Sequence, residues 1–457
     1  MGKFDMPGAA QKKPVIEDVT DLAEEVTEEP KPPITKGLKL TAMEIEEAVS
    51  RLEPKKGPPP TPKEPEEIAI TEAEEINVQE SDVEPAYEVR GFYGLEVTAT
   101  IEKKSKRKGN EQDPNEDAVI TDPETGIFGV ADGLGGGGKP GSGAQASRAL
   151  ERGLADEFKK KMEAAARASL GAVQKGFVEQ QLRRAGSDAP EKRKQITEHV
   201  EKMLSVDARM GRKAVALIEA LRAQNETVKK SGGKTTACIG FIHETKDGKH
   251  YAVAANIGDS GAFVRRANGA VEALTQEDSM ANALLSSGAI SQEELNEMKK
   301  NPDKKMEMTL PMDLVKALDP ELHRQLAAKG KNGLRTEMSY AQLKVAMVRA
   351  LGSDLFEPSI AYKELKKGDS LILMTDGLID EAQAVAEKRR TELLARAGAD
   401  KKKIDAVPSV DDLVLAVLGE WSNKKTSKER TDGIRTEADN VDSKDDDKAI
   451  VQATVTK

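Results

Sequence analysis

Two hydrophobic patterns alternate along the chain from about residue 87 onward. Short apolar runs bounded by Gly, Asn, Asp and Pro are typical of strands. Longer segments with apolar residues three or four positions apart are typical of helices. We predict strands at residues 94–101, 118–121, 127–131, 236–243, 251–257, 262–266, 360–362, 370–374 and 449–455, and helices at residues 143–168, 193–229, 280–300, 311–326, 381–397 and 410–421.

The order of these segments predicts an α+β domain built in layers. Groups of strands are separated by long helical stretches, so sheets and helices are expected to pack as distinct layers. Asn268 and Gly269, between two apolar runs, predict a tight hairpin turn. We expect one domain over residues 89–457, with helical inserts near 150–230 and 280–345.

The first part of the chain has a different composition. Residues 1–90 contain 22 acidic and 11 basic residues, whereas the remaining chain is almost neutral. This segment is rich in Pro, Glu and Lys and has too few apolar residues to offset its ordering entropy. We predict a disordered acidic tail over residues 1–88, which is a candidate binding site for a partner protein.

The remaining composition narrows the class of protein. Cys238 is the one cysteine, which excludes an intrachain disulfide and a cysteine-rich metal site and fits a reducing compartment. No apolar run approaches the ~18–20 residues that span a bilayer, and the N-terminus lacks a secretory pattern. No basic block suits nucleic acid. We therefore expect a cytoplasmic protein that binds neither membranes nor nucleic acid.

Acidic clusters at strand ends are the candidate chemistry. They include Asp117 before one strand, Asp132 and Asp376 after two others, and Asp259 in a turn between two more. A further cluster, residues 443–448, precedes the last predicted strand. Carboxylates that converge from several strand ends would form an all-oxygen site for Mg²⁺ or Mn²⁺. Any single Asp-Gly pair is more simply a turn, but several in order are not.

Two other kinds of chemistry fit the sequence less well. The four histidines lie outside the acidic clusters, so catalysis by a histidine pair or a histidine zinc site is not expected. Residues 133–140 nearly spell a nucleotide-binding P-loop, but Pro140 stands where Ser or Thr must hold Mg²⁺. Residues 232–236 are read as a turn into the following strand, with a structural role.

The motifs, taken in order, resemble the PPM-type (type 2C) metal-dependent protein phosphatases. They are NEDA (115–118), GVADGLGG (129–136), GGKTTA (232–237), ANIGDSGAFV (255–264), ALTQEDS (273–279), VRALG (348–352), LILMTDGLID (371–380) and SKDDDKAIVQ (443–452). The resemblance spans roughly residue 91 to the C-terminus. It implies a four-layer α-β-β-α sandwich of two antiparallel sheets with a two-metal site at one edge.

The resemblance also implies roles for particular residues. Asp132 corresponds to the carboxylate that bridges both metals, and Gly133 to the residue that offers its carbonyl. Asp376 corresponds to a ligand of the other metal, and Asp259 to a ligand of a weaker third one. The last ligand precedes the final strand; Asp446 fits best, with Asp445 as the alternative. Asp117 corresponds to the carboxylate that holds the attacking water.

Three positions depart from the family pattern. Gln112 stands where the family often has an arginine that grips the phosphate; Arg107 or Lys108 is the candidate replacement. Leu134 follows Asp-Gly, as in many bacterial members, where animal members have histidine. Asp278 stands where the family often has histidine.

The expected activity is hydrolysis of phosphoserine or phosphothreonine in other proteins. Two cations about 3.5–4 Å apart would activate a bridging water for in-line attack on phosphorus. The alternative is a catalytically weak pseudophosphatase that binds phosphoproteins or acts as a scaffold; Gln112 favours it, whereas the complete carboxylate set favours the enzyme. A P-loop nucleotide hydrolase is a third hypothesis, and Pro140 argues against it.

Overall fold

The structure is a computed structural model. It describes residues 87–89, 92, 94–101, 115–134, 141–185, 190–318, 320–398, 401–424, 426–439 and 446–456. The acidic tail expected over residues 1–88 therefore lies almost entirely outside the described residues, and its division from the domain stays a prediction.

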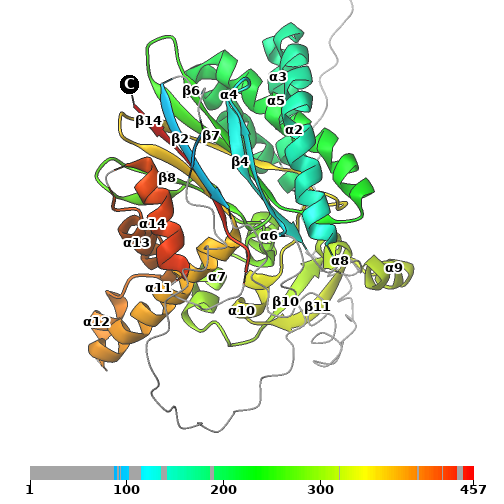
Figure 1. Ribbon diagram of the computed structural model, residues 1–457. Helices are drawn as coiled ribbons and strands as arrows, with labels where there is room; N and C mark the ends of the chain where they lie inside the picture. The colour runs from blue at the N-terminus through cyan, green and yellow to red at the C-terminus, as the bar shows by residue number, and fades with distance from the viewer. Residues whose placement is uncertain are drawn as a thin grey trace, which may run out of the picture. The chain divides into compact units, whose positions relative to one another are not determined.

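Two antiparallel sheets form the centre of the domain (Figure 1). The first sheet has the order β1-β2-β14-β13-β8-β9, and the second has the order β12-β7-β6-β4-β3, with β5 paired to β4. Their strands are β1 (Tyr87–Val89), β2 (Leu95–Ile101), β14 (Ala449–Val455), β13 (Ser370–Met374), β8 (Gly261–Arg265), β9 (Val271–Ala273), β12 (Ser359–Leu365), β7 (His250–Ile257), β6 (Ala237–Glu244), β4 (Ile127–Leu134), β3 (Asp117–Asp122) and β5 (Lys234–Thr235).

Alternation along the strands builds the layers, because successive side chains point to opposite faces of a sheet. In β4, Phe128 and Val130 join the apolar core between the two sheets, whereas Ile127 and Ala131 join the core beneath the helices. In β14, Val451 belongs to the core between the sheets. The sequence-based expectation of a four-layer α-β-β-α sandwich is confirmed.

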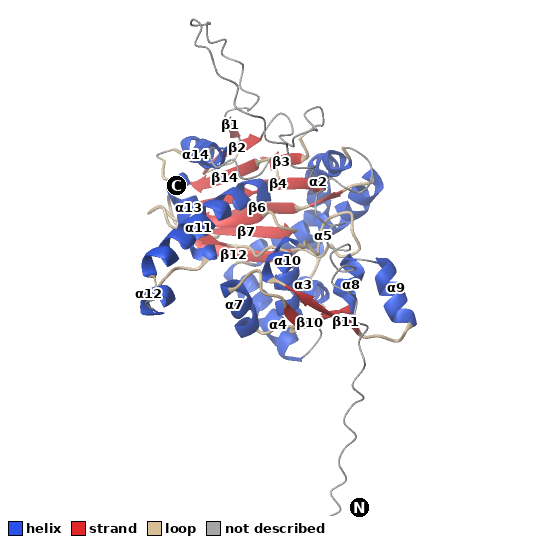
Figure 2. Ribbon diagram, turned by 90° about the horizontal axis from the view of Figure 1, so that it is seen from below, coloured by secondary structure: helices blue, strands red, loops and turns tan. Residues whose placement is uncertain are grey.

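Helices cover the outer face of each sheet (Figure 2). One group of helices shares an apolar core with the second sheet. The other group shares a separate apolar core with the first sheet. The second sheet is covered by α2 (Ser142–Arg167), α3 (Leu170–Ala185), α4 (Pro190–Val206) and α5 (Ala208–Ser231); the first is covered by α11 (Asp376–Ala397), α13 (Val410–Trp421) and α14 (Ser427–Asp439), with α12 (Lys401–Asp405) following α11.

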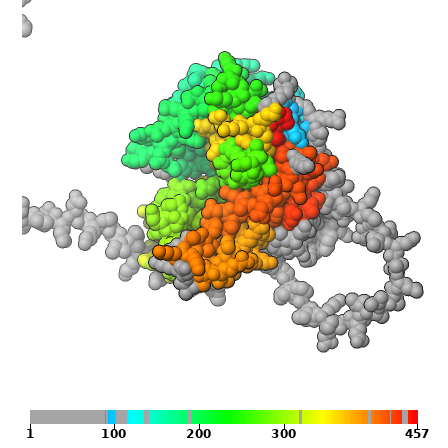
Figure 3. All heavy atoms as spheres, turned by 90° about the vertical axis from the view of Figure 1, so that its left-hand side faces the viewer, coloured from blue at the N-terminus to red at the C-terminus, as the bar shows by residue number. Residues whose placement is uncertain are grey.

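The segment between β9 and β12 has an apolar core of its own and contains a two-stranded antiparallel sheet that was not predicted from the sequence. Lys299 in this segment forms an ion pair of 2.6 Å with Asp411 of α13. The yellow-green residues of the segment and the orange residues of the C-terminal helices lie next to each other in Figure 3. The elements are α6 (Met280–Ser287), α7 (Gln292–Lys300), β10 (Met306–Pro311), α8 (Met312–Leu318), α9 (Pro320–Ala328), β11 (Gly333–Met338) and α10 (Tyr340–Val345).

Local capping explains where the expected helices differ from the observed ones. The single helix expected at 193–229 is two helices, because Asp207 accepts a hydrogen bond from the N–H of Arg209 and starts α5. The helix expected at 280–300 is also two. Gly288, with φ of 73°, ends α6, and Ser291 begins α7 with a capping box. Helices α3, α10, α12 and α14 were not predicted.

Candidate metal centre

Asp117 and Asp132 lie directly opposite each other in the β3–β4 ladder. Both are buried, with 0% and 6% of their surface exposed. Opposed residues of an antiparallel pair project from the same face of the sheet, with their Cβ atoms about 4.5–5.5 Å apart. Strand register alone therefore brings these two carboxylates together.

Two threonines fix the backbone of Asp132. The N–H of Asp132 donates to Thr236 Oγ1 at 3.0 Å. Its carbonyl accepts from Thr235 Oγ1 at 2.8 Å and from the N–H of Thr236 at 2.8 Å. Residues 232–236 were expected to form a turn with a structural role, and Gly232, with φ of 81°, lies at that turn. The two threonines that follow hold the strand end that presents Asp132.

Asp117 is held on one side and unsatisfied on the other. Its Oδ2 accepts a hydrogen bond of 2.9 Å from Thr375 Oγ1, while its N–H donates to Asn115 Oδ1 at 2.7 Å. Its Oδ1 is buried and has no hydrogen-bond partner among the described residues. A buried carboxylate oxygen left without a partner is costly. Oδ1 of Asp117 is therefore available to contact a bound ion or a water molecule.

Asp259 and Asp376 complete the centre of the cluster. Asp376 is the first residue of α11, after β13, and Asp259 lies in the turn between β7 and β8. One carboxylate oxygen each from Asp132, Asp259 and Asp376 lie within 4.8 Å of one another. Oδ1 of Asp259 is buried and, in the described part of the chain, has no hydrogen-bond partner. This all-oxygen donor set fits a hard divalent cation.

The acidic segment before β14 approaches the same place. Asp446 is half-buried and close enough to Asp117 and Asp132 to raise the pKa of both. Asp447 is 2% exposed, and its Oδ2 accepts from the N–H of Glu116 at 2.8 Å. Asp446 thus faces the cluster while Asp447 ties β14 to the residue before Asp117. The alternative, Asp445, lies outside the described residues.

The glycines after Asp132 and Asp376 serve close backbone contact, which differs from the turn role expected of Asp-Gly. Gly133 continues strand β4, and a Cβ on it would lie 2.2 Å from the carbonyl oxygen of Gly143. Gly377 lies in the first turn of α11, and its Cβ would lie 2.1 Å from the carbonyl oxygen of Asp447. Any side chain there would push apart the segments that carry the carboxylates.

Burial and like charge act together on the titration of the cluster. Burial, and then the nearby Asp447, raise the pKa of Asp117 well above its usual value. Burial, and then Asp376 and Asp117, do the same for Asp132. Burial, and then Asp376, raise the pKa of Asp259. Bound cations would relieve both effects, because they neutralise the charge that burial and repulsion disfavour.

This electrostatic strain predicts a pH-dependent response to metal. Above the usual carboxyl pKa of 3.8, the folded metal-free protein binds more protons than the unfolded chain. The buried carboxyl groups therefore lower the stability of the metal-free fold as pH rises through their raised pKa. Cations bind the ionised carboxylates. We expect the rise in melting temperature caused by Mn²⁺, relative to EDTA, to grow between about pH 5 and about pH 8. A difference independent of pH in thermal unfolding would contradict this.

Several supporting residues were not anticipated from sequence. Thr375, which donates to Asp117, and Asp447, which anchors β14, are two of them. A third feature is the buried contact between Lys448 Nζ and Glu381 Oε1, 3.9 Å apart, which joins the start of β14 to α11. Thr375, Asp447 and Lys448 lie within recognised motifs, but their partners are distant in the sequence. The spacing along the chain therefore held no signal for the pairing.

Other expected positions are not visible or have other surroundings. Arg107, the candidate for gripping phosphate, lies outside the described residues, as do Lys108, Gln112 and Pro140. Leu134 ends β4. His243 is half-buried, with Nε2 3.2 Å from Asp207 Oδ2, and lies outside the acidic clusters at the strand ends.

Comparisons with known proteins identify the family. The sequence pattern of the family described as protein phosphatase 2C matches residues 106–402, more than half of the chain. No curated protein sequence matches the chain significantly. Among the described helices, none is long and apolar enough to cross a membrane.

Solved bacterial structures resemble the chain at low identity. PppA of Pseudomonas aeruginosa is 15% identical with a TM-score of 0.39, over 79% of this chain and 97% of that one. The serine/threonine phosphatase PstP of Mycobacterium tuberculosis is 16% identical with a TM-score of 0.38, over 79% and 99%. Stp1 of Staphylococcus aureus is 18% identical with a TM-score of 0.38, over 79% and 96%.

These TM-scores are low, so the family assignment rests on the sequence match. That match covers all of the acidic motifs except the last, and the strand ends bring their carboxylates together. The chain belongs to the protein phosphatase 2C family, the metal-dependent protein serine/threonine phosphatases that use Mg²⁺ or Mn²⁺.

Proposed function

We propose that this phosphatase hydrolyses phosphoserine and phosphothreonine in other proteins at a two-metal site formed by Asp132, Asp376 and Asp446. The observation that supports this most directly is the convergence of the oxygens of Asp132, Asp259 and Asp376 within 4.8 Å. Two such cations would activate water and neutralise charge on the phosphoryl oxygens. No residue of the chain needs to act as nucleophile.

Each carboxylate has a proposed task. Asp132 bridges the two sites from the end of β4, and Gly133 offers its carbonyl to one of them. Asp376 and Asp446 complete the pair of sites, and Asp259 shares a third, weaker one with Asp376. Burial raises the pKa of Asp132 and Asp259, and perturbed carboxylates of this kind support a role in binding cations.

Asp117 has a different task in this proposal. We assign its Oδ1 to orient the attacking water and accept its hydrogen bond, because that atom is buried and without a partner among the described residues. Thr375 keeps the carboxylate in place through Oδ2. Attack forms the new oxygen–phosphorus bond as the bond to the serine or threonine oxygen breaks, which yields phosphate and the free hydroxyl.

The grip on the phosphoryl group is assigned to Arg107. The family's usual arginine position is occupied by Gln112, and Arg107 is the nearest arginine in the same segment. A guanidinium suits this task, because it can bind two phosphoryl oxygens at once. We also propose a reducing location such as the cytoplasm, since Cys238 is the one cysteine and is buried.

A direct test is phosphate release from a phosphothreonine peptide with Mn²⁺, with Mg²⁺ and with EDTA. We expect release with either metal and none with EDTA, together with weak or no activity on phosphotyrosine. Release that EDTA leaves unchanged would contradict the proposal. A preference for phosphotyrosine would contradict the substrate assignment while leaving the metal chemistry intact.

The acidic tail should not be part of the catalytic unit. We expect deletion of residues 1–85 to change the kcat/KM for a small aryl phosphate by less than about twofold, because every carboxylate assigned to the site lies beyond residue 115. The measurement is steady-state hydrolysis by the full and the shortened chain. A loss of tenfold or more would show that the tail contributes to catalysis.

A further inference from the structure

The buried carboxylate of Asp278 holds the turn that presents Asp259. Only 2% of Asp278 is exposed. Its Oδ2 accepts from the N–H of Gly258 at 3.0 Å, and its own N–H donates to the carbonyl of Gly258 at 2.8 Å. Both polar groups of Gly258 are therefore bonded to one residue, directly beside Asp259.

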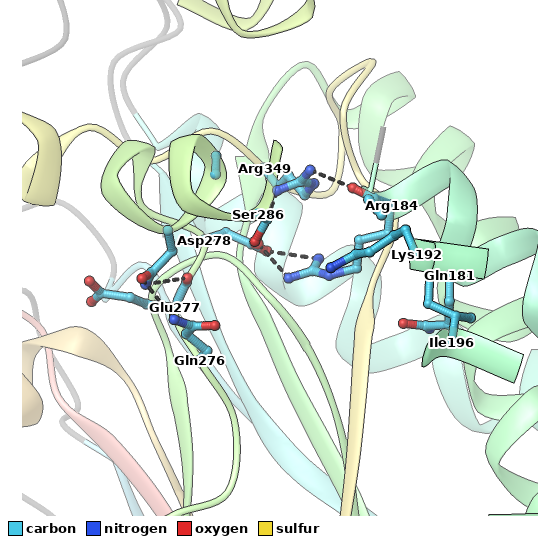
Figure 4. Close-up of a pocket in the computed structure, with 12 residues that line it drawn as sticks. Gln181, Arg184, Lys192, Ile196, Gln276, Glu277, Asp278, Ser286 and Arg349 are labelled. Atoms are coloured by element: carbon cyan, nitrogen blue, oxygen red, sulfur yellow. Dashed lines mark hydrogen bonds and ion pairs between the residues drawn. The ribbon is translucent and has the colours of Figure 1, made fainter. Parts of the chain in front are cut away.

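Asp278 is itself held by two arginines from distant parts of the chain (Figure 4). Arg184 of α3 donates from Nη2 to Oδ1 at 2.6 Å and from Nη1 to Oδ2 at 3.3 Å. Arg349 donates from Nη1 to Oδ1 at 3.3 Å and from Nη2 to the carbonyl of Arg184 at 2.8 Å. A forked guanidinium contact of this kind fixes both the place and the orientation of a carboxylate.

Few packing contacts could replace this link. A cavity of about 170 Å³ opens beside the arginines, lined by residues of α3, α4 and α6 together with the segment that carries Asp278. Arg184 and Arg349 are 16% and 15% exposed. The ion pair therefore connects α3 to the turn beside this cavity.

The turn itself has little freedom to adjust. Gly258 has φ of 96°, and a Cβ there would lie 2.8 Å from Cβ of Thr236. Thr236 accepts from the N–H of Asp132 and shares a hydrogen bond of 2.7 Å with Ser260. On one side, the turn at 258–260 contacts Thr236, which also supports Asp132. On the other side, it is bonded to Asp278.

We propose that Asp278 is a positioning residue for Asp259, and that Arg184 makes helix α3 part of that support. This inference rests on the proposed function, which assigns Asp259 to a cation. Partners that orient a ligand in this way typically contribute about 10- to 100-fold to metal affinity. Helix α3 lies in one of the inserts, so this ion pair would link the insert to the metal centre.

The test is Mn²⁺ binding measured by titration calorimetry. We expect Asp278→Asn and Arg184→Met each to weaken the weakest Mn²⁺ site by about 10-fold or more. Arg184→Lys, which keeps the charge but not the fork, should lie between Arg184→Met and the natural protein. The matched control is Arg183→Met, since Arg183 is the neighbouring residue and pairs with Glu357 at 3.1 Å instead. It should leave Mn²⁺ binding unchanged.

The Asp259→Asn background separates positioning from a general structural role. There, Asp278→Asn and Arg184→Met should cause no further loss of Mn²⁺ affinity. An equal loss in both backgrounds would overturn the inference. So would normal Mn²⁺ binding by the Arg184→Met variant, which keeps Asp278 paired with Arg349 and need not unfold. If Asp259→Asn itself leaves Mn²⁺ binding intact, the proposed site is wrong and the inference falls with it.

Discussion

Asp132→Asn and Asp376→Asn should each lower kcat/KM by about a thousandfold or more while the fold survives. Each change removes a charge from the group of carboxylates whose oxygens lie within 4.8 Å of one another. Stabilisation of the transition state by a bound cation amounts to several kcal/mol, and about 4 kcal/mol corresponds to a thousandfold in rate. Steady-state hydrolysis of a phosphopeptide at saturating Mn²⁺ measures the effect.

The same variants should be more stable than the natural protein when no metal is present. Burial and neighbouring Asp376 raise the pKa of Asp132, so the ionised carboxylate is unfavourable in the fold, and asparagine removes that charge. Thermal unfolding in EDTA tests this. Asp156→Asn, on an exposed position of α2, is the control and should alter neither property. If either site variant hydrolyses the phosphopeptide at the natural rate, the aspartate replaced in that variant is not a metal ligand.

Gly377→Ala should damage both stability and activity, although the glycine contributes no side chain to the site. The new Cβ would lie 2.1 Å from the carbonyl oxygen of Asp447, so α11 and the segment before β14 must separate. Overpacking of this kind typically costs about 1–3 kcal/mol. Asp376 lies in α11 and Asp446 lies in the segment before β14, so separating the two segments displaces these carboxylates. We expect kcat/KM to fall about a hundredfold, the usual effect of displacing a catalytic group by about 1 Å.

A second glycine gives the matched comparison. Gly176 lies on α3, and a Cβ there would meet nothing within 4 Å. Gly176→Ala should therefore stabilise the protein by about 0.5–1 kcal/mol, as alanine does in a helix, without affecting catalysis. Urea unfolding and phosphopeptide hydrolysis of both variants measure the contrast. Equal stability and activity in the two alanine variants would show that the close approach at Gly377 is not required.

The parts of the fold that could be read from the sequence are those with local signals. The strand at 449–455 was predicted with its observed bounds, since it is a short run rich in β-branched residues and an acidic segment precedes it. The hairpin turn at Asn268 and Gly269 was also predicted, and β8 and β9 pair across it. Asp132, Asp259 and Asp376 were recognised because each is next to a strand end.

What escaped the sequence reading depends on contacts between distant residues. Arg184 and Asp278 are 94 positions apart, and nothing in either segment indicates the pairing. The need for glycine at 377 arises from the approach of Asp447, which becomes visible only when α11 and β14 lie side by side. The two-stranded sheet of β10 and β11 was not predicted because its short alternating strands lie among longer helical patterns.

The most direct test of the metal centre is a crystal structure with Mn²⁺, in which anomalous scattering locates the cations. We predict two strong peaks in contact with Asp132, one also touching Asp376 and Asp446, and a weaker third peak between Asp259 and Asp376. Peaks elsewhere, or none at these carboxylates in crystals of protein that hydrolyses phosphothreonine in a Mn²⁺-dependent way, would contradict the assignment of the site.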